Sequence, residues 1–73
     1  MQSFDYKKSY GTLIYESRKR KNLTQMKLAE FLETTDKIIS KWENEINFPS
    51  NKFLLKLCDV LEIEVKELLK LKY

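Results

Sequence analysis

The sequence predicts a single all-α domain. Apolar residues recur three and four positions apart in several segments, which is the spacing of a helix with one buried face. No segment alternates apolar and polar residues as a half-buried strand does, and there is no internal repeat or low-complexity stretch. A chain of 73 residues holds one small domain, and a domain of this size is marginally stable unless its core is well used.

The first helix is predicted over about residues 10–21. Its inward face is formed by four residues at helical spacing: Tyr10, Leu13, Ile14 and Ser17. The helix ends at Asn22, a residue that tolerates the left-handed conformation common just after helices. Thr24 follows, and its hydroxyl can accept a hydrogen bond from a free backbone N–H of the next turn. A second helix is therefore predicted over residues 25–32, with an inner face of Leu28, Ala29 and Leu32.

The segment Glu-Thr-Thr, residues 33–35, contains neither glycine nor proline, yet it separates two helical patterns. Thr35 can offer its side chain to the backbone in competition with helix continuation, and Asp36 suits the positive end of a helix. A third helix is therefore predicted over residues 36–44. Two short helices joined so tightly must cross steeply and share one core, formed by Leu28, Ala29, Leu32, Ile39 and Trp42. This is a helix-turn-helix, whose second helix is free to enter the major groove of DNA.

Pro49 and Ser50 mark the next boundary, where Ser50 can cap a fourth helix. The apolar stripe of that helix consists of Leu54, Leu57, Cys58 and Leu61. The following segment LEIEVKELL, residues 61–69, leaves two interpretations open, because its spacing suits both a fifth helix and a longer fourth one. Ile63 lies off the stripe, which favours a break.

The residue types exclude several classes of function. The chain has no histidine, no Gly-rich phosphate loop and no nucleophile with a neighbouring base, so we predict no catalytic residue, cofactor or metal site and no enzyme. The single cysteine, Cys58, cannot form an internal disulfide and is expected as a buried small hydrophobe in a reducing cytoplasm. No run approaches the roughly 18 apolar residues that a membrane span needs.

The charge pattern favours an anionic partner. The net charge is +3, and the run RKRK at residues 18–21 places four cations in about one helical turn. Lys37 and Lys41 follow at a spacing of four. A solvated helix face is the alternative interpretation of such runs.

A set of matching features in a fixed order links the chain to a known family. The features are Gly11, Ile14 and Arg18, then LTQ and LAEFL, then IISKWE, and then FPS before a Leu-rich end. With them, residues 10–69 resemble the Cro/phage-repressor (xenobiotic-response-element type) helix-turn-helix family. The resemblance implies a compact five-helix bundle of the lambda-repressor-like type over residues 10–70, with the motif at about 24–44. A flexible N-terminal extension (1–9) and a C-terminal tail (71–73) would flank it.

The same resemblance implies a function in transcription. Members of the family mostly bind operator DNA, often as homodimers, so we expect a repressor that binds an inverted repeat in double-stranded DNA. It would be encoded by a bacterium or phage and act in the cytoplasm, at the nucleoid. The chain departs from the family where Glu33 and Glu45 replace glycines and Asn44 replaces a basic residue. These changes remove positive charge near the DNA side.

A helical wheel separates the outer face of the third helix from Ile39 and Trp42. Five residues project outward: Asp36, Lys37, Ser40, Lys41 and Asn44. The two lysines can donate to guanine O6 and N7 or to phosphate, while Asp36 can accept from cytosine N4–H or simply stabilise the helix dipole.

Residues outside the third helix are also expected at the DNA. The resemblance assigns Gln25 to a phosphate and to the support of the third helix, where the start of the second helix already attracts anions. Thr35 caps the third helix and can also touch phosphate. Asn47 and Lys52 are weaker candidates for phosphate contacts.

Three further residues are expected to be structural. The resemblance implies an ion pair between Arg18 and Glu43 that braces the first helix against the third. Lys19, Arg20 and Lys21 are expected to face solvent, with a place near DNA as the alternative. Trp42 is expected as a core anchor, because it follows Ile39 by three on the inward face.

Two other classes of function compete with DNA binding. A protein-interaction module could keep the same fold and give the same helical face to another protein, and the acidic Glu33, Asp36 and Glu45 favour it. A membrane-surface role for residues 52–72 is weakened by four acidic side chains that would face anionic lipid. The sequence therefore predicts DNA binding first and a protein-interaction module second.

Overall fold

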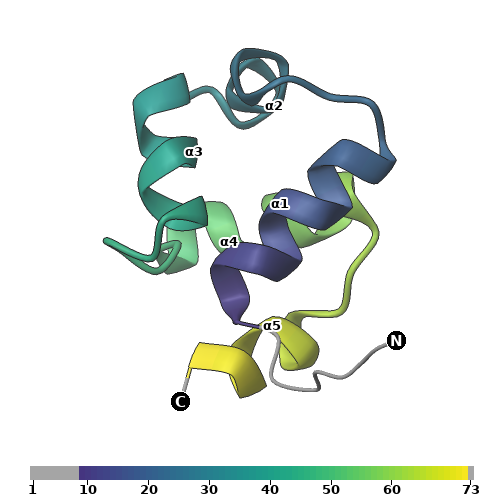
Figure 1. Ribbon diagram of the computed structural model, residues 1–73, viewed down its shortest axis with the longest axis vertical. Coiled ribbons are helices and arrows are strands. Elements are labelled where there is room, and N and C mark those ends of the chain that lie inside the picture. Colours follow the sequence, from purple (N-terminus) through teal and green to yellow (C-terminus); the bar gives the residue numbers. More distant parts are fainter. Residues whose placement is uncertain (1–8, 73) are drawn as a thin grey trace.

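The computed structural model describes residues 9–72, which form five helices and no strand. The helices are α1 (Tyr10–Arg20), α2 (Gln25–Leu32), α3 (Asp36–Glu43), α4 (Asn51–Leu61) and α5 (Val65–Lys72). Figure 1 shows α1 across the middle of the molecule, with α2 above it, α3 to the left, α4 behind and α5 below. The predicted all-α, five-helix fold is confirmed, and the open question of the last segment is answered by a break between α4 and α5.

The predicted boundaries differ from the observed ones by a residue or two at several places. Lys21 and Asn44 were expected inside helices, but they are the C-cap residues of α1 and α3. Leu71 and Lys72, expected in a C-terminal tail, form the last turn of α5. The tail's last residue and the extension up to residue 8 lie outside the described residues.

The helix starts show which predicted caps form. Thr24 accepts a hydrogen bond from the Lys27 N–H at 2.9 Å, and Thr35 accepts one from the Ile38 N–H at 3.4 Å. Ser50 stands at the N-cap position of α4, but its predicted side-chain cap is wrong. A capping hydroxyl would accept a hydrogen bond from the Phe53 N–H. That N–H donates instead to the Ser50 backbone carbonyl, at 3.0 Å.

The first four helices end in the same way, with a non-glycine residue in the left-handed region. These residues are Asn22 (φ 60°), Glu33 (φ 58°), Glu45 (φ 62°) and Glu62 (φ 58°). After α2, for example, the Thr34 N–H donates to the Ala29 carbonyl at 2.9 Å, so the reversed backbone adds a hydrogen bond at the end of the helix. This is the physical stop signal within Glu-Thr-Thr: Glu33 turns the chain out of α2, and Thr35 starts α3.

One apolar core joins all five helices. It consists of Leu13, Ile14, Leu28, Ala29, Leu32, Ile39, Trp42, Leu54, Leu57, Cys58, Leu61 and Leu68. Ile39 is fully buried and Trp42 is 2% exposed, so the inward face of α3 is held against α1 and α2. With these two residues inward, the opposite face of α3 is left to solvent.

Candidate nucleic-acid interface

The outer face of α3 presents most of the residues expected at DNA. Asp36, Lys37, Lys41 and Asn44 are exposed, and Ser40 is half-buried. The Asn44 side-chain amide donates to the Ser40 carbonyl at 3.0 Å and to the Ser40 hydroxyl at 3.2 Å. Ser40 and Asn44 therefore form one hydrogen-bonded pair, and the two lysines are the exposed donors of this face. Asp36 lies in the first turn of α3, where its negative charge suits the helix dipole.

The ion pair expected between Arg18 and Glu43 is present and buried. Arg18 Nε donates to Glu43 Oε2 at 2.6 Å and Nη2 donates to Oε1 at 3.1 Å, and the two side chains are 7% and 6% exposed. Arg18 Nη1 also donates to the Leu23 carbonyl at 2.8 Å. The guanidinium therefore connects the end of α1, the α1–α2 turn and the last residue of α3. Such a two-bonded geometry fixes orientation as well as distance.

Gln25 is part of the same network. Its side-chain nitrogen donates to Glu43 Oε1 at 3.0 Å, so the first residue of α2 is tied to the last residue of α3. This bond accounts for the supporting role that the resemblance implied. It also uses one amide donor internally and leaves the side-chain oxygen and the backbone N–H for other contacts.

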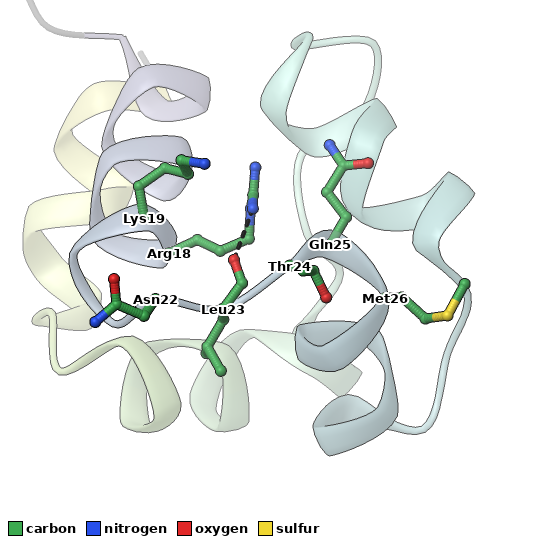
Figure 2. Close-up of a pocket in the computed structure, with 7 residues that line it drawn as sticks. All are labelled: Arg18, Lys19, Asn22, Leu23, Thr24, Gln25 and Met26. Carbon is green, nitrogen blue, oxygen red and sulfur yellow. Dashed lines mark hydrogen bonds between the residues drawn. The ribbon is translucent and has the colours of Figure 1, made fainter.

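A hollow opens where α1 ends and α2 begins. Its lining consists of Arg18, Lys19, Asn22, Leu23, Thr24, Gln25 and Met26. Figure 2 shows Lys19 on α1 and Gln25 on α2 at opposite sides, with Arg18 between them. Helix N-termini attract anions, and a lysine facing one strengthens that attraction. Lys19 is exposed, as expected, and it also lines this hollow, which the run RKRK could have indicated.

A second hollow lies on the other side of Gln25. It is lined by Gly11, Thr12, Tyr15, Gln25, Glu43 and Asn44. Tyr15, which is 47% exposed, was missed by the sequence analysis. The Arg18 guanidinium lies 5.3 Å from the centre of the Tyr15 ring, which restrains the tyrosine beside Gln25. Tyr15 was detectable as an aromatic residue on the solvent side of a helix whose other face is apolar.

The described residues also bear on metal binding, membrane spanning and the reactivity of the single cysteine. Within residues 9–72, no group of three or more histidine, cysteine, aspartate or glutamate side chains is arranged to hold a metal ion. None of the helices in that range is long and apolar enough to cross a membrane. Cys58 is buried in α4, and burial raises the pKa of its thiol, which keeps it in the unreactive neutral form.

Sequence comparison identifies the family. A family model described as a helix-turn-helix domain matches residues 11–73, most of the chain. The chain belongs to the Cro/phage-repressor helix-turn-helix family. None of the curated proteins matches it significantly in sequence.

Solved structures of this helix-turn-helix family share the fold. The P22 c2 repressor, crystallised with a synthetic operator, is 28% identical to the chain with a TM-score of 0.82, covering 86% of this chain and 96% of that one. SinR, a master regulator for biofilm formation crystallised with DNA, is 33% identical with a TM-score of 0.72, covering 82% and 97%. The DNA-binding domain of SinR from Bacillus subtilis is 33% identical with a TM-score of 0.73, covering 82% and 88%. Proteins of this family are DNA-binding regulators.

Proposed function

We propose that this protein is a sequence-specific transcriptional regulator, a repressor, that inserts α3 into the major groove of double-stranded DNA. The observation that carries the proposal is the geometry of α3. Its inner face is buried through Ile39 and Trp42, its end is fixed by Arg18 and Gln25, and its outer face carries exposed donors. The likeness to the P22 c2 repressor and SinR, both crystallised with DNA, supports the same conclusion.

The exposed residues of α3 can contact both the bases and the phosphates of DNA. Lys37 and Lys41 lie one turn apart on the exposed face and can donate to guanine O6 and N7 or to phosphate. Asp36 can accept from a cytosine amino group at the start of the helix. The Ser40–Asn44 pair stands at the far end of the same face, where its oxygens and remaining donors can meet base edges or backbone.

The two hollows beside Gln25 fit DNA phosphates. The first offers Lys19 and the N-terminus of α2, and the second offers the hydroxyls of Thr12 and Tyr15. Thr35, exposed at the start of α3, can add another hydroxyl. Phosphate contacts beside Gln25 and at the start of α3 would set how deeply and at what angle the helix enters the groove.

We further infer the setting in which this regulator acts. Two copies would bind an inverted repeat, with half-sites about 34 to 36 Å apart on one side of the duplex. The protein would act without enzymatic activity or cofactor in the cytoplasm, at the nucleoid. A partner protein on the outer face of α3 is the competing function.

The face of α3 is tested by comparing two double variants that remove the same charge. Lys37→Ala/Lys41→Ala changes the exposed face of α3, whereas Lys66→Ala/Lys70→Ala removes two lysines at the same spacing from α5. Binding to a short random-sequence duplex is measured against salt. Each lost phosphate contact lowers the slope of log binding constant against log salt concentration by about 1 in magnitude. We therefore expect this slope to fall by about 2 in the α3 variant and to change little in the α5 variant.

Equal effects of the two double variants would mean that the lysines act only through net charge, which would contradict binding by α3. No binding of the unchanged protein to any duplex would overturn DNA binding and shift the weight to a protein partner. Circular dichroism of both variants checks that the helices remain folded.

A further inference from the structure

The loop after α3 contains an acidic residue in an unfavourable backbone conformation. Glu45 has a φ of 62°, in the left-handed region where a side chain costs about 1 kcal/mol or more and where glycine is favoured. The turn closes α3, since the Glu45 N–H donates to the Trp42 carbonyl at 3.1 Å and the Ile46 N–H donates to the Lys41 carbonyl at 2.9 Å. A glycine would serve this turn at lower cost, so the Glu45 side chain should have a role of its own.

The Glu45 side chain reaches the start of α1. Its Oε2 accepts a hydrogen bond from the Gly11 N–H at 2.8 Å, across 34 positions of sequence. The first turn of α1 contains no acidic residue, and the Ser9 hydroxyl caps the Thr12 N–H, at 3.2 Å. Glu45 therefore supplies both a second cap and the negative charge that a helix N-terminus favours.

Gly11 permits this approach because it has no side chain. A Cβ built at Gly11 would lie 2.4 Å from the Glu43 carbonyl oxygen and 2.7 Å from Glu45 Cγ, both too short for real contacts. The backbone at the start of α1 therefore rests directly on the backbone at the end of α3. Tyr10 lies at the same junction, where burial, and secondarily the Glu45 carboxylate, raise the pKa of its hydroxyl.

We propose that Glu45 is a positioning residue for DNA reading, which clamps the end of α3 to the start of α1 through Gly11. The clamp lies next to Asn44 and to the last turn that carries Lys41, so it sets where these two side chains stand relative to the groove. Together with the Arg18–Glu43 pair it holds the end of α3 at two separate places on α1. This role rests on the proposed DNA binding.

The clamp itself is tested in the free protein, without DNA. Hydrogen exchange of the Gly11 amide is followed by NMR in the unchanged protein, in Glu45→Ala and in Glu45→Gln. Loss of a helix cap corresponds to about a fivefold change in the equilibrium between the closed and the opened helix end. The rate of hydrogen exchange at Gly11 should therefore rise by about that factor in Glu45→Ala. Glu45→Gln keeps an oxygen acceptor and should retain most of the protection. Unchanged exchange at Gly11 in Glu45→Ala would show that the clamp does not exist.

The positioning role is tested by binding to a duplex selected from random DNA. The matched control is Glu33→Ala, which removes the same charge from another exposed glutamate in the same backbone conformation. We expect Glu45→Ala to bind about fivefold more weakly than Glu33→Ala, and Glu45→Gln to bind like the unchanged protein. Circular dichroism establishes that each variant is folded.

Loss of the clamp and loss of phosphate repulsion change the affinity for DNA in opposite directions, so the binding measurement separates them. If Glu45 acted only by repelling phosphates, both Glu45→Ala and Glu45→Gln would bind more tightly than the unchanged protein, and the positioning role would be overturned. Equal binding of Glu45→Ala and Glu33→Ala would overturn it as well. If the unchanged protein bound no DNA, the proposed function and the positioning role would fail together, while the exchange measurement would still decide whether the clamp exists.

Discussion

Replacing Arg18 by alanine should come close to unfolding the domain. The change leaves the Glu43 carboxylate, whose side chain is 6% exposed, without the guanidinium that donates to both of its oxygens. It also leaves the Leu23 carbonyl without its donor. Gln25 remains as a neutral partner of Glu43, which is a weak substitute for a positive charge.

The expected loss can be compared with the stability available. Removing one member of a buried, hydrogen-bonded ion pair costs about 3 to 5 kcal/mol. Domains have unfolding free energies of roughly 0.05 to 0.15 kcal/mol per residue, which is about 4 to 11 kcal/mol for a chain of 73 residues. The variant should therefore lose about a quarter or more of its stability, and it would be largely unfolded at 25 °C if the unfolding free energy is near about 4 kcal/mol and the cost near about 5 kcal/mol.

Urea unfolding followed by helix circular dichroism measures this loss, and the chain contains a matched control. Lys21 pairs with Glu62, but these side chains are 33% and 71% exposed, so Lys21→Ala should cost less than about 1 kcal/mol. In the double variant Arg18→Ala/Glu43→Ala the cost should be well below the sum of the two single changes, because no lone charge stays buried. A cost for Arg18→Ala no greater than that for Lys21→Ala would refute the bracing role of the buried pair.

Three further predictions concern other parts of the molecule. Glu33→Gly should raise the free energy of unfolding by about 1 kcal/mol in urea unfolding, because it relieves a left-handed residue, and an unchanged or lower stability would contradict this. Burial raises the pKa of Cys58 above its ordinary 9.0, so the unfolded thiol ionises first and stability should fall as pH rises past 9.0. The free energy of unfolding of Cys58→Ala, measured by urea unfolding across that pH range, should fall less steeply than that of the unchanged protein. An equal fall in both would assign the loss of stability to other groups. If Lys37 reads a base, Lys37→Ala should lower the discrimination at one base pair of a selected site by about 1 to 3 kcal/mol of binding free energy. If Lys37 holds a phosphate, the variant should bind all duplexes more weakly by the same factor. A binding titration that shows no effect would remove Lys37 from the interface.

Local signals made much of the fold predictable. Thr24 and Thr35 each cap a helix by accepting from a backbone N–H three positions later in the chain. The inward positions of Ile39 and Trp42 follow from their spacing alone. The pair between Arg18 and Glu43, 25 positions apart, came from the family resemblance, since no local rule joins residues so distant.

Contacts between distant segments were what the sequence could not show. The Gly11–Glu45 bond depends on how α1 crosses the end of α3, and Glu45 alone looked like a loss of favourable charge. Tyr15 lines a hollow that exists only once α1, the start of α2 and the end of α3 are brought together. The break before α5 was open because its apolar spacing also suits a continuous helix, and Glu62 in the left-handed conformation decides it.

Selection of binding sites from random duplex DNA, followed by titration of the enriched site against salt, tests the central claim most directly. We predict an enriched inverted repeat with half-sites about one helical turn apart, and an affinity for it that falls steeply with salt. A pool without enrichment, bound weakly and equally in all sequences, would contradict sequence-specific reading by α3.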